Sequence, residues 1–429
     1  MSAVEYRINT GEDQPIAEAP GRPGELDHLR PLPRISVHAF CATENMYSLM
    51  EKLAQDRRMG KVSFRVNQGG IPAAVTMFAS APTPNLILLE TTADSRLLMD
   101  ELAPLAEVCD PSTKVVIIGR QNDIQLYRDL IRNGVSEYLV APVSLGDIIA
   151  AIASIFVDPE AEPLGRSIAF IGAKGGVGSS TIAHNIAWGI SSLFSSETVL
   201  ADLDLPFGTA NIDFDQDPAQ GIAEAVYSPD RLDEVFLDRL LTKCSAHLSL
   251  LAAPSLLDRT YDFDGQAFQL LIETLHRTSP ISVLDVPHVW NDWTRSVLAS
   301  VDEVVITAAP DLANLRNTKN LFDQLRKLRP NDKMPHLVLN QVGMPKRPEI
   351  LPADFCEPLD AEPIAIIPFD SQLFGSAANS GRMIGEMDGK SAAAEVMSQI
   401  AHIVTGRVAV KKAKSGGLSA ILGKLSKKK

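Results

Sequence analysis

The sequence predicts an α/β protein with two domains in succession, each built around a mostly parallel sheet. Short apolar segments alternate with amphipathic helical patterns from residue 35 to 156, and the alternation resumes at residue 166. A stretch rich in proline and acidic residues, Val157–Gly165, separates the two series and is typical of a linker. The 429 residues, 45% of them apolar, are enough for more than one core.

The first 34 residues contain five prolines among polar and acidic side chains and show no sustained apolar period. This composition predicts a disordered tail over 1–34. From 35 to 156 we expect a five-stranded domain of flavodoxin-like order, with helices between the strands. The predicted strands are Ile35–Phe40, Val62–Val66, Leu86–Leu89, Val115–Gly119 and Glu137–Val140.

This first domain resembles the receiver domains of bacterial response regulators, most clearly over Pro84–Glu90 and Asn133–Pro142. A receiver carries an acceptor aspartate after its third strand, but this chain has Glu90 there. The acidic pair after the first strand is replaced by the neutral run Ala39–Cys41, and the late lysine by Ala141. The resemblance therefore implies a receiver-like fold without phosphotransfer, kept as a docking or dimerising module. Another kind of flavodoxin-like domain remains open, because a fold alone does not give a function.

The second domain begins with the apolar strand Ile168–Ile171, which runs into a glycine-rich loop, Ala173–Thr181, and then into the helical stretch Ile182–Ile190. Glycines let backbone N–H groups turn toward phosphates, and the helix N-terminus adds a positive dipole end. The loop carries an early lysine, Lys174. The position just before the final Ser/Thr pair, where a lysine is expected, holds Ser179.

Two more predicted strands end in carboxylates. Val199–Asp204 ends in Asp202 and Asp204, which at i and i+2 would project from one face of a strand, and Ile281–Pro287 contains Asp285. Ligands of open parallel sheets gather at the carboxyl ends of strands, which is where all these side chains fall. Taken alone, the carboxylate at either strand end could equally be a helix cap or an ordinary loop residue.

Over about Arg166–Thr405 the chain resembles the MinD/ParA family of dimerising P-loop ATPases, which have a mostly parallel, doubly wound sheet. The resemblance rests on the glycine-rich loop, on the two acidic strand ends, and on Val338–Gln341 and Ile366–Asp370. It implies ATP and Mg²⁺ as cofactors and a homodimer with two ATP molecules between the subunits. It assigns the phosphates to Gly175, Gly176, Val177, Gly178, Ser179, Ser180 and Thr181.

Further roles follow from the same resemblance. Ser180 would be the magnesium ligand, Asp202 would support the magnesium shell, and Asp285 would occupy the second magnesium position. Lys174 would reach the partner's nucleotide, and Asp204 would position the attacking water. The base would be recognised by Asn340, with Pro368 and Asp370 shaping the pocket wall.

Ser179 departs from the family pattern. A cation about 4 Å from a phosphate charge is worth up to roughly 4 kcal/mol in a partly screened site, before the cost of desolvation. Without that lysine we expect weak ATP binding by the monomer, tighter binding in a dimer through Lys174, and weak or slow hydrolysis at best.

The formal charge of −13 argues against nucleic acid as the main partner. Four scattered cysteines lack metal or disulfide spacing, and no apolar run spans a bilayer, so a cytoplasmic location is expected. The segment 406–429 differs: from Lys411 onward it holds seven lysines and no acids, and an apolar stripe lies at Leu418, Ile421, Leu422 and Leu425. It would suit an anionic inner-membrane surface, as in MinD, or equally a solvated basic tail or an acidic partner.

The order of a degenerate receiver-like domain, a short linker and a MinD/ParA-like domain resembles the CpaE/TadZ pilus-assembly proteins. This implies an ATP-binding, dimerising factor that places a type IV (Flp/Tad) pilus secretion apparatus at a cell pole, with pilus-assembly components as partners. A pure interaction scaffold without nucleotide is an alternative. A ParA-type DNA-segregation ATPase is another, which the acidic body disfavours.

Overall fold

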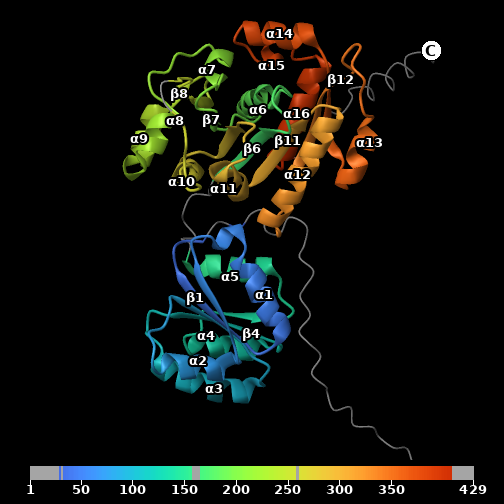
Figure 1. The fold of residues 1–429 in the computed structure, drawn as a ribbon. Coiled ribbons are helices and arrows are strands. Elements are labelled where there is room, and N and C mark those ends of the chain that lie inside the picture. Colours follow the sequence, from blue (N-terminus) through green and yellow to red (C-terminus); the bar gives the residue numbers. More distant parts are fainter. Residues whose placement is uncertain (1–28, 30–31, 157–164, 258–259, 408–429) are drawn as a thin grey trace, which may run out of the picture. The chain divides into compact units, whose positions relative to one another are not determined.

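The computed structural model describes residues 29, 32–156, 165–257 and 260–407. Almost all of the predicted tail 1–34, linker 157–165 and basic segment 406–429 lies outside these described residues. The chain divides into two compact units (Figure 1), of which the first also contains residues 326–333. None of the described helices combines the length and apolarity needed to cross a membrane.

The first unit contains a parallel five-stranded sheet in the order β2-β1-β3-β4-β5. This is the flavodoxin-like order expected from the sequence. The strands are β1 (Ser36–Cys41), β2 (Ser63–Gln68), β3 (Leu86–Glu90), β4 (Lys114–Gly119) and β5 (Glu137–Val140). The longer helices are α1 (Glu44–Ala54), α2 (Gly70–Phe78), α3 (Ser95–Val108), α4 (Ile124–Arg132) and α5 (Leu145–Phe156).

Two apolar cores cover the two faces of this sheet. Helices α1 and α5 pack on one face, and α2, α3 and α4 pack on the other (Figure 1). Leu32 is also buried in the first of these cores, and its backbone N–H bonds Arg58 O at 2.9 Å. Strand β3 is buried along its whole length because both faces of a parallel sheet are covered.

Glu90, at the end of β3, turns its carboxylate inward. It accepts hydrogen bonds from the backbone N–H groups of Ala42 (2.7 Å) and Thr43 (2.8 Å) and from Thr43 Oγ1 (2.7 Å). The carboxylate thus holds the loop between β1 and α1 in place. Its acceptor atoms are used inside the unit.

The second unit contains an eight-stranded sheet in the order β13-β12-β11-β6-β10-β7-β9-β8. Neighbouring strands pair in parallel except for the short antiparallel pair of β8 and β9 at one edge, so the expected mostly parallel sheet is confirmed. The strands are β6 (Arg166–Gly172), β7 (Thr198–Asp202), β8 (Thr242–Lys243), β9 (Leu248–Leu251), β10 (Ile281–Val286), β11 (Glu303–Ala308), β12 (His336–Val342) and β13 (Pro363–Pro368).

Helices cover both faces of this sheet, as doubly wound folds require. Helices α6 and α16 share one core with the sheet, while α10, α11 and α12 lie on the opposite face (Figure 1). The helices are α6 (Ser179–Phe194), α7 (Ala210–Asp213), α8 (Ile222–Tyr227), α9 (Glu234–Leu240), α10 (Gln269–Thr278), α11 (Asp292–Ser300), α12 (Leu312–Leu328), α13 (Pro352–Cys356), α14 (Ser371–Asn379), α15 (Ile384–Met387) and α16 (Ala392–Val404).

Candidate functional site

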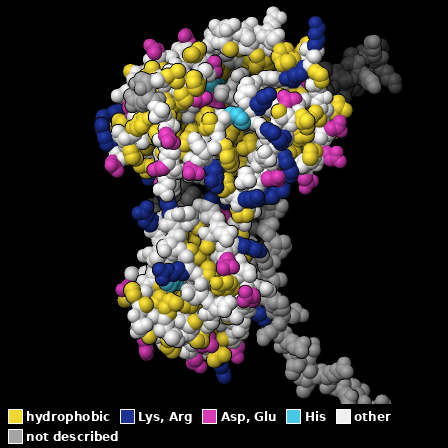
Figure 2. Space-filling model, viewed as in Figure 1, with side chains coloured by type: hydrophobic (Ala, Val, Ile, Leu, Met, Phe, Trp, Pro, Cys, Tyr) yellow, Lys and Arg dark blue, Asp and Glu magenta, His cyan; other side chains and the backbone are white. Residues whose placement is uncertain are grey.

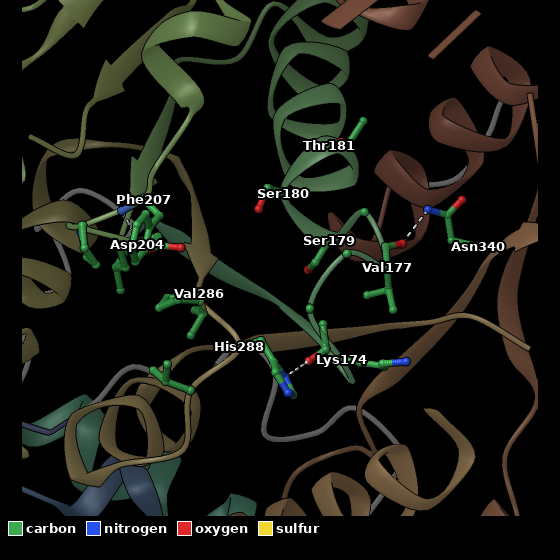
Figure 3. A pocket seen from close by; sticks show the side chains of 18 of the residues that line it. Lys174, Val177, Ser179, Ser180, Thr181, Asp204, Phe207, Val286, His288 and Asn340 are labelled. Atoms are coloured by element: carbon green, nitrogen blue, oxygen red, sulfur yellow. Dashed lines mark hydrogen bonds between the residues drawn. The ribbon is translucent and has the colours of Figure 1, made fainter. Parts of the chain in front are cut away.

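A cavity of about 950 Å³ lies in the second unit, where β6, β7, β10, β12 and β13 end (Figure 3). Ligand sites of open α/β sheets occur at this edge. Most of the site residues predicted from the sequence line the cavity. They are Lys174, Gly175, Gly176, Val177, Gly178, Ser179, Ser180, Thr181, Asp204, Asn340, Pro368 and Asp370.

The glycine-rich loop Ala173–Thr181 takes a backbone path that only glycine adopts readily. Gly176 has φ 81° and Gly178 has φ 86°, both in the left-handed region. Helix α6 begins at Ser179 directly after Gly178, and no side chain caps that helix end. The first N–H groups of α6 are therefore left for a ligand, which favours an anion in the cavity.

Four side chains from distant parts of the chain hold the carbonyl groups around this loop. Nδ2 of Asn340 donates to Val177 O at 2.8 Å (Figure 3), and Nε2 of Gln341 donates to Gly176 O at 2.9 Å. Nδ2 of Asn317, on α12, donates to Ala173 O at 2.9 Å, and Nδ1 of His288 lies 2.8 Å from Gly172 O. These four contacts tie the loop to α12, to β12 and to the segment that follows β10.

Asn340 therefore has a contact that the sequence did not predict. The resemblance assigned its amide to a base, whereas the structure pairs its Nδ2 with the loop. Asn317, Gln341 and His288 were not singled out from the sequence. Gln341 follows Asn340 at the strand end and was the one with a visible signal. Asn317 lies within the amphipathic pattern of α12, where nothing distinguishes it from other polar residues.

The cavity contains little positive charge for a site that would bind phosphates. Among the described residues that line the cavity, Lys174 is the only lysine or arginine. Lys174 is exposed and lowers the pKa of Asp311; burial of Asp311 opposes this shift, but hydrogen bonds from Asn314 and the charge of Lys174 outweigh it. The Ser179 hydroxyl has no hydrogen-bond partner in the described structure. Replacing Ser179 by a residue with a longer side chain would therefore break no existing hydrogen bond.

Asp202, Asp285 and His184 form a cluster at the sheet, and none of the three lines the cavity. Their exposed fractions are 1%, 3% and 0%. Asp285 shares a face of β10 with Ile281 and Val283, which pack against α6, so strand alternation aims its carboxylate at that helix. Nε2 of His184 lies 3.3 Å from Asp285 Oδ2, and Nδ1 lies 2.7 Å from Asp213 Oδ2.

Asp202 and Asp204 do not share a strand face, contrary to the expectation from their spacing. Strand β7 ends at Asp202, and the chain then turns. Asp202 accepts hydrogen bonds from the backbone N–H groups of Asp204 (3.0 Å) and Ala210 (3.1 Å). Asp204 instead reaches the cavity, across from Asn340 (Figure 3).

Of the three metal ligands predicted from the sequence, Ser180 lines the cavity and the two aspartates lie in the cluster. His184 was missed. Its only sequence signal is its position four residues after Ser180, on the same side of a helix.

Burial and neighbouring charges shift the pKa values of Asp202 and His184. Burial raises the pKa of Asp202 to about 7, and the charge of Asp285 adds to this effect. For His184, burial opposes protonation, but the carboxylates of Asp213 and Asp285 outweigh it and raise the pKa to about 10. Such shifts are typical of functional sites, although structural ion pairs produce them too.

Large apolar side chains are exposed beside the cavity. Phe207 is 68% exposed and Val289 is 45% exposed, and both line the cavity mouth. Trp290, next in the chain, is 45% exposed. Figure 2 shows apolar side chains among charged ones on the visible face of the second unit. Exposed aromatic groups next to a ligand site are typical of an interaction surface.

Comparison with solved structures places the chain among known proteins. It is 46% identical to a pilus assembly protein CpaE from Caulobacter crescentus, covering 30% of this chain and 98% of that one, with a TM-score of 0.29. It is 36% identical to a CpaE2 pilus assembly protein from Sinorhizobium meliloti, covering 28% and 99%, with a TM-score of 0.28.

A ParA family ATPase from Chlorobium tepidum is 23% identical and covers 55% of this chain and 98% of that one, with a TM-score of 0.51. This likeness supports the fold of the second unit. No protein-family model matches the chain, and no curated protein does.

Proposed function

Since this chain belongs to the family of CpaE pilus assembly proteins, we propose that it is a nucleotide-dependent factor of pilus assembly that binds ATP and Mg²⁺ in the cavity of its second unit. The observation that carries this proposal is the glycine-rich loop, whose carbonyls are paired to side chains while the first N–H groups of α6 remain uncapped. Such a loop is built for the phosphates of a nucleotide.

The lining residues fit magnesium and a triphosphate. The Ser180 hydroxyl, at the start of α6, is the magnesium ligand, and Gly175–Thr181 hold the phosphates. Bound Mg²⁺ would supply charge neutralisation at the outer phosphates. Asp204 orients the attacking water, and Asn340, Pro368 and Asp370 flank the base. Asp202 and Asp285 are left out of this assignment because they do not line the cavity.

We further propose that the active form is a homodimer formed across the cavity mouth. Lys174 is exposed there, as are Phe207 and Trp290, and a second copy would cover all three. In that dimer Lys174 supplies the charge that Ser179 lacks. Hydrolysis is then slow, since positioning and charge provide most of the catalysis of phosphoryl transfer.

The carboxylate of Glu90 is engaged by Ala42 and Thr43 inside the first unit, where a receiver would present its phosphate acceptor. The receiver-like unit therefore acts as a docking module and supplies the contact with the pilus machinery. The dimer locates the type IV (Flp/Tad) apparatus at the inner face of the membrane and at a cell pole. A fluorescent fusion that stays diffuse in cells with intact pili would contradict the localisation.

The central test is the mass of the full chain in solution with and without ATP and Mg²⁺, measured by light scattering. We expect dimers with nucleotide for the wild type, monomers for Lys174→Ala, and persistent dimers for Asp204→Ala. Lys319→Ala removes a lysine that pairs with Asp323 on α12, and as a matched control it should dimerise like the wild type. Nucleotide-independent mass for the wild type would contradict the proposal.

The neutral side chain of Ser179 also favours a second candidate, an interaction scaffold that has lost nucleotide. It predicts no binding of a fluorescent ATP analogue at any protein concentration. Saturable binding that Lys174→Ala weakens would exclude the scaffold.

A further inference from the structure

A groove of about 700 Å³ lies on the second unit between β13 and α13, apart from the cavity described above. Among the described strands β13 pairs only with β12, so the groove follows an edge of the eight-stranded sheet. Its walls are mainly apolar and include Pro352, Ala353, Cys356, Pro363 and Ile366, of which Ile366 is 41% exposed. An apolar groove along a sheet edge is a place where a further segment can pack.

The rim of this α13 groove carries negative charge only. Glu357, Asp360 and Glu362 line it and are exposed, and no described lysine or arginine lines it. None of the three carboxylates forms an ion pair with a side chain in the described part of the chain. Figure 2 shows acidic side chains at the side of the second unit where α13 lies in Figure 1. The groove therefore suits a segment that is both apolar and basic.

We propose that the segment Lys411–Lys429 of the same chain occupies the α13 groove. This segment matches both features of the groove, because it holds seven lysines and no acids and carries apolar side chains at 418, 421, 422 and 425. The lysines pair with the three carboxylates of the rim. The apolar side chains cover Ile366 and the prolines of the walls.

The last described residues lie within reach of the groove. Gly406 is beside Arg166 at the start of β6, since a Cβ on Gly406 would lie 3.1 Å from Arg166 Nη1. β6 and β13 are three strand spacings apart, about 14 Å. The register places Pro363 level with Ile171, about 16 Å farther along β6. The eleven residues after 407 that lead to Leu418 can span about 36 Å, which is more than this separation.

Membership of the same chain favours this segment over a separate partner. A short connection holds a segment near its site at an effective concentration on the order of millimolar, so that even a weak contact is occupied. Exposed ion pairs contribute little each, so packing of the apolar side chains supplies most of the binding and the charges supply selectivity. While it lies in the α13 groove, the segment is withheld from any other anionic surface.

Carbodiimide coupling tests the proposal, because this reagent joins a lysine amine directly to a carboxylate that it contacts. The full chain is treated without nucleotide, and links are identified by mass spectrometry in material of single-chain mass. We expect the lysines of 411–429 to be linked to Glu357, Asp360 and Glu362. Glu395, an exposed acid on α16 outside the groove, is the reference and should give few links.

A full-chain variant separates docking from chance collision. Leu418→Ser combined with Leu422→Ser keeps every lysine, so chance collision would leave the links unchanged, whereas docking predicts that most of them are lost. Leu312→Ser is the matched control. It removes a leucine on α12 that is 73% exposed and does not line the groove, and the links should persist.

Three results would overturn the proposal: no links to the groove in the wild type, links unchanged in the double leucine variant, or links found only between two chains. Sedimentation with phosphatidylserine vesicles is the second arm. A wild type that gives no groove links but sediments with vesicles, while the double leucine variant does not, would assign the segment to a membrane surface instead. The groove shares no lining residue with the nucleotide cavity, so failure here would leave the proposed ATP-dependent dimer untouched.

Discussion

The side-chain amide of Asn340 donates a 2.8 Å hydrogen bond to the backbone carbonyl of Val177, a residue 163 positions earlier in the chain. Asn340 is buried, and the bond ties strand β12 to the glycine-rich loop. The loop conformation that exposes N–H groups to the cavity thus depends on a residue outside the loop.

Asn340→Ala should weaken both the fold and nucleotide binding. The Val177 carbonyl loses its partner, and an unpaired buried acceptor costs about 1–3 kcal/mol. The three tryptophans, at 188, 290 and 293, all lie in the second unit, so urea unfolding followed by tryptophan fluorescence reports on this unit. Gln341→Ala removes a more exposed bond to the same loop and should cost less; an equal or larger loss would contradict the role given to Asn340.

Ser179→Lys should strengthen ATP binding by about tenfold or more and speed hydrolysis. A lysine beside the phosphates adds charge, and the serine hydroxyl that it replaces makes no bond. Affinity for a fluorescent ATP analogue and phosphate release measure the two effects. Ser179→Met has similar length without charge. Equal gains for methionine and lysine would show that the site does not contact phosphate.

Glu90→Gln should loosen the loop between β1 and α1. An amide can accept from one backbone N–H but would turn its own NH₂ toward another, and hydrogen bonds to a charged group are worth about 1.5–3 kcal/mol. Hydrogen–deuterium exchange of a peptide covering Ala42 and Thr43 should accelerate. Glu107→Gln changes an exposed glutamate on α3 and should leave that exchange unaltered.

Glu303→Gln should destabilise the second unit at neutral pH and have little effect in acid. Burial opposes ionisation of Glu303, but His336, 3.1 Å away, and Arg166 hold the pKa of this carboxyl below its usual 4.5. A lowered folded pKa gives stability that is present above pH 4.5 and is lost as pH falls through the folded value.

The difference in urea midpoint between wild type and Glu303→Gln should therefore shrink steadily below pH 4.5. At pH 7 we expect a loss of about 2 kcal/mol, since a partly buried ion pair is broken. A difference that grows toward acid would have the wrong sign for this carboxylate.

Most strands of both sheets could be predicted from the sequence, because parallel strands that are buried on both faces appear as continuous apolar runs. The cavity could also be located, since Lys174 and Asp204 follow strand ends and Asn340 lies near the end of β12, and the structure brings all three to one edge of the sheet. The prediction that Asp202 and Asp204 share a strand face was wrong, because β7 ends at Asp202. A period of two holds only while the strand continues.

The partners of the glycine-rich loop were beyond sequence reasoning for a physical reason. Asn317 and His288 contact the loop through the packing of separate elements, and no local pattern records which polar residue of a helix faces a distant carbonyl. His184 lies within the apolar pattern of α6, and the sequence does not indicate the role of a single polar residue there. Its role emerges only when β10 and α7 bring Asp285 and Asp213 to it.

The partners that hold the glycine-rich loop have a consequence for biosynthesis. The four side chains that bind its carbonyls lie 116 to 165 residues downstream of the groups they bind. The whole loop is therefore synthesised long before Asn340 and Gln341. During synthesis from the N-terminus, contacts between residues far apart in the sequence form last. A nascent chain stopped before residue 340 carries the complete loop sequence but lacks the two β12 side chains that fix it. The loop can therefore take its phosphate-binding conformation only after residue 341 has been made.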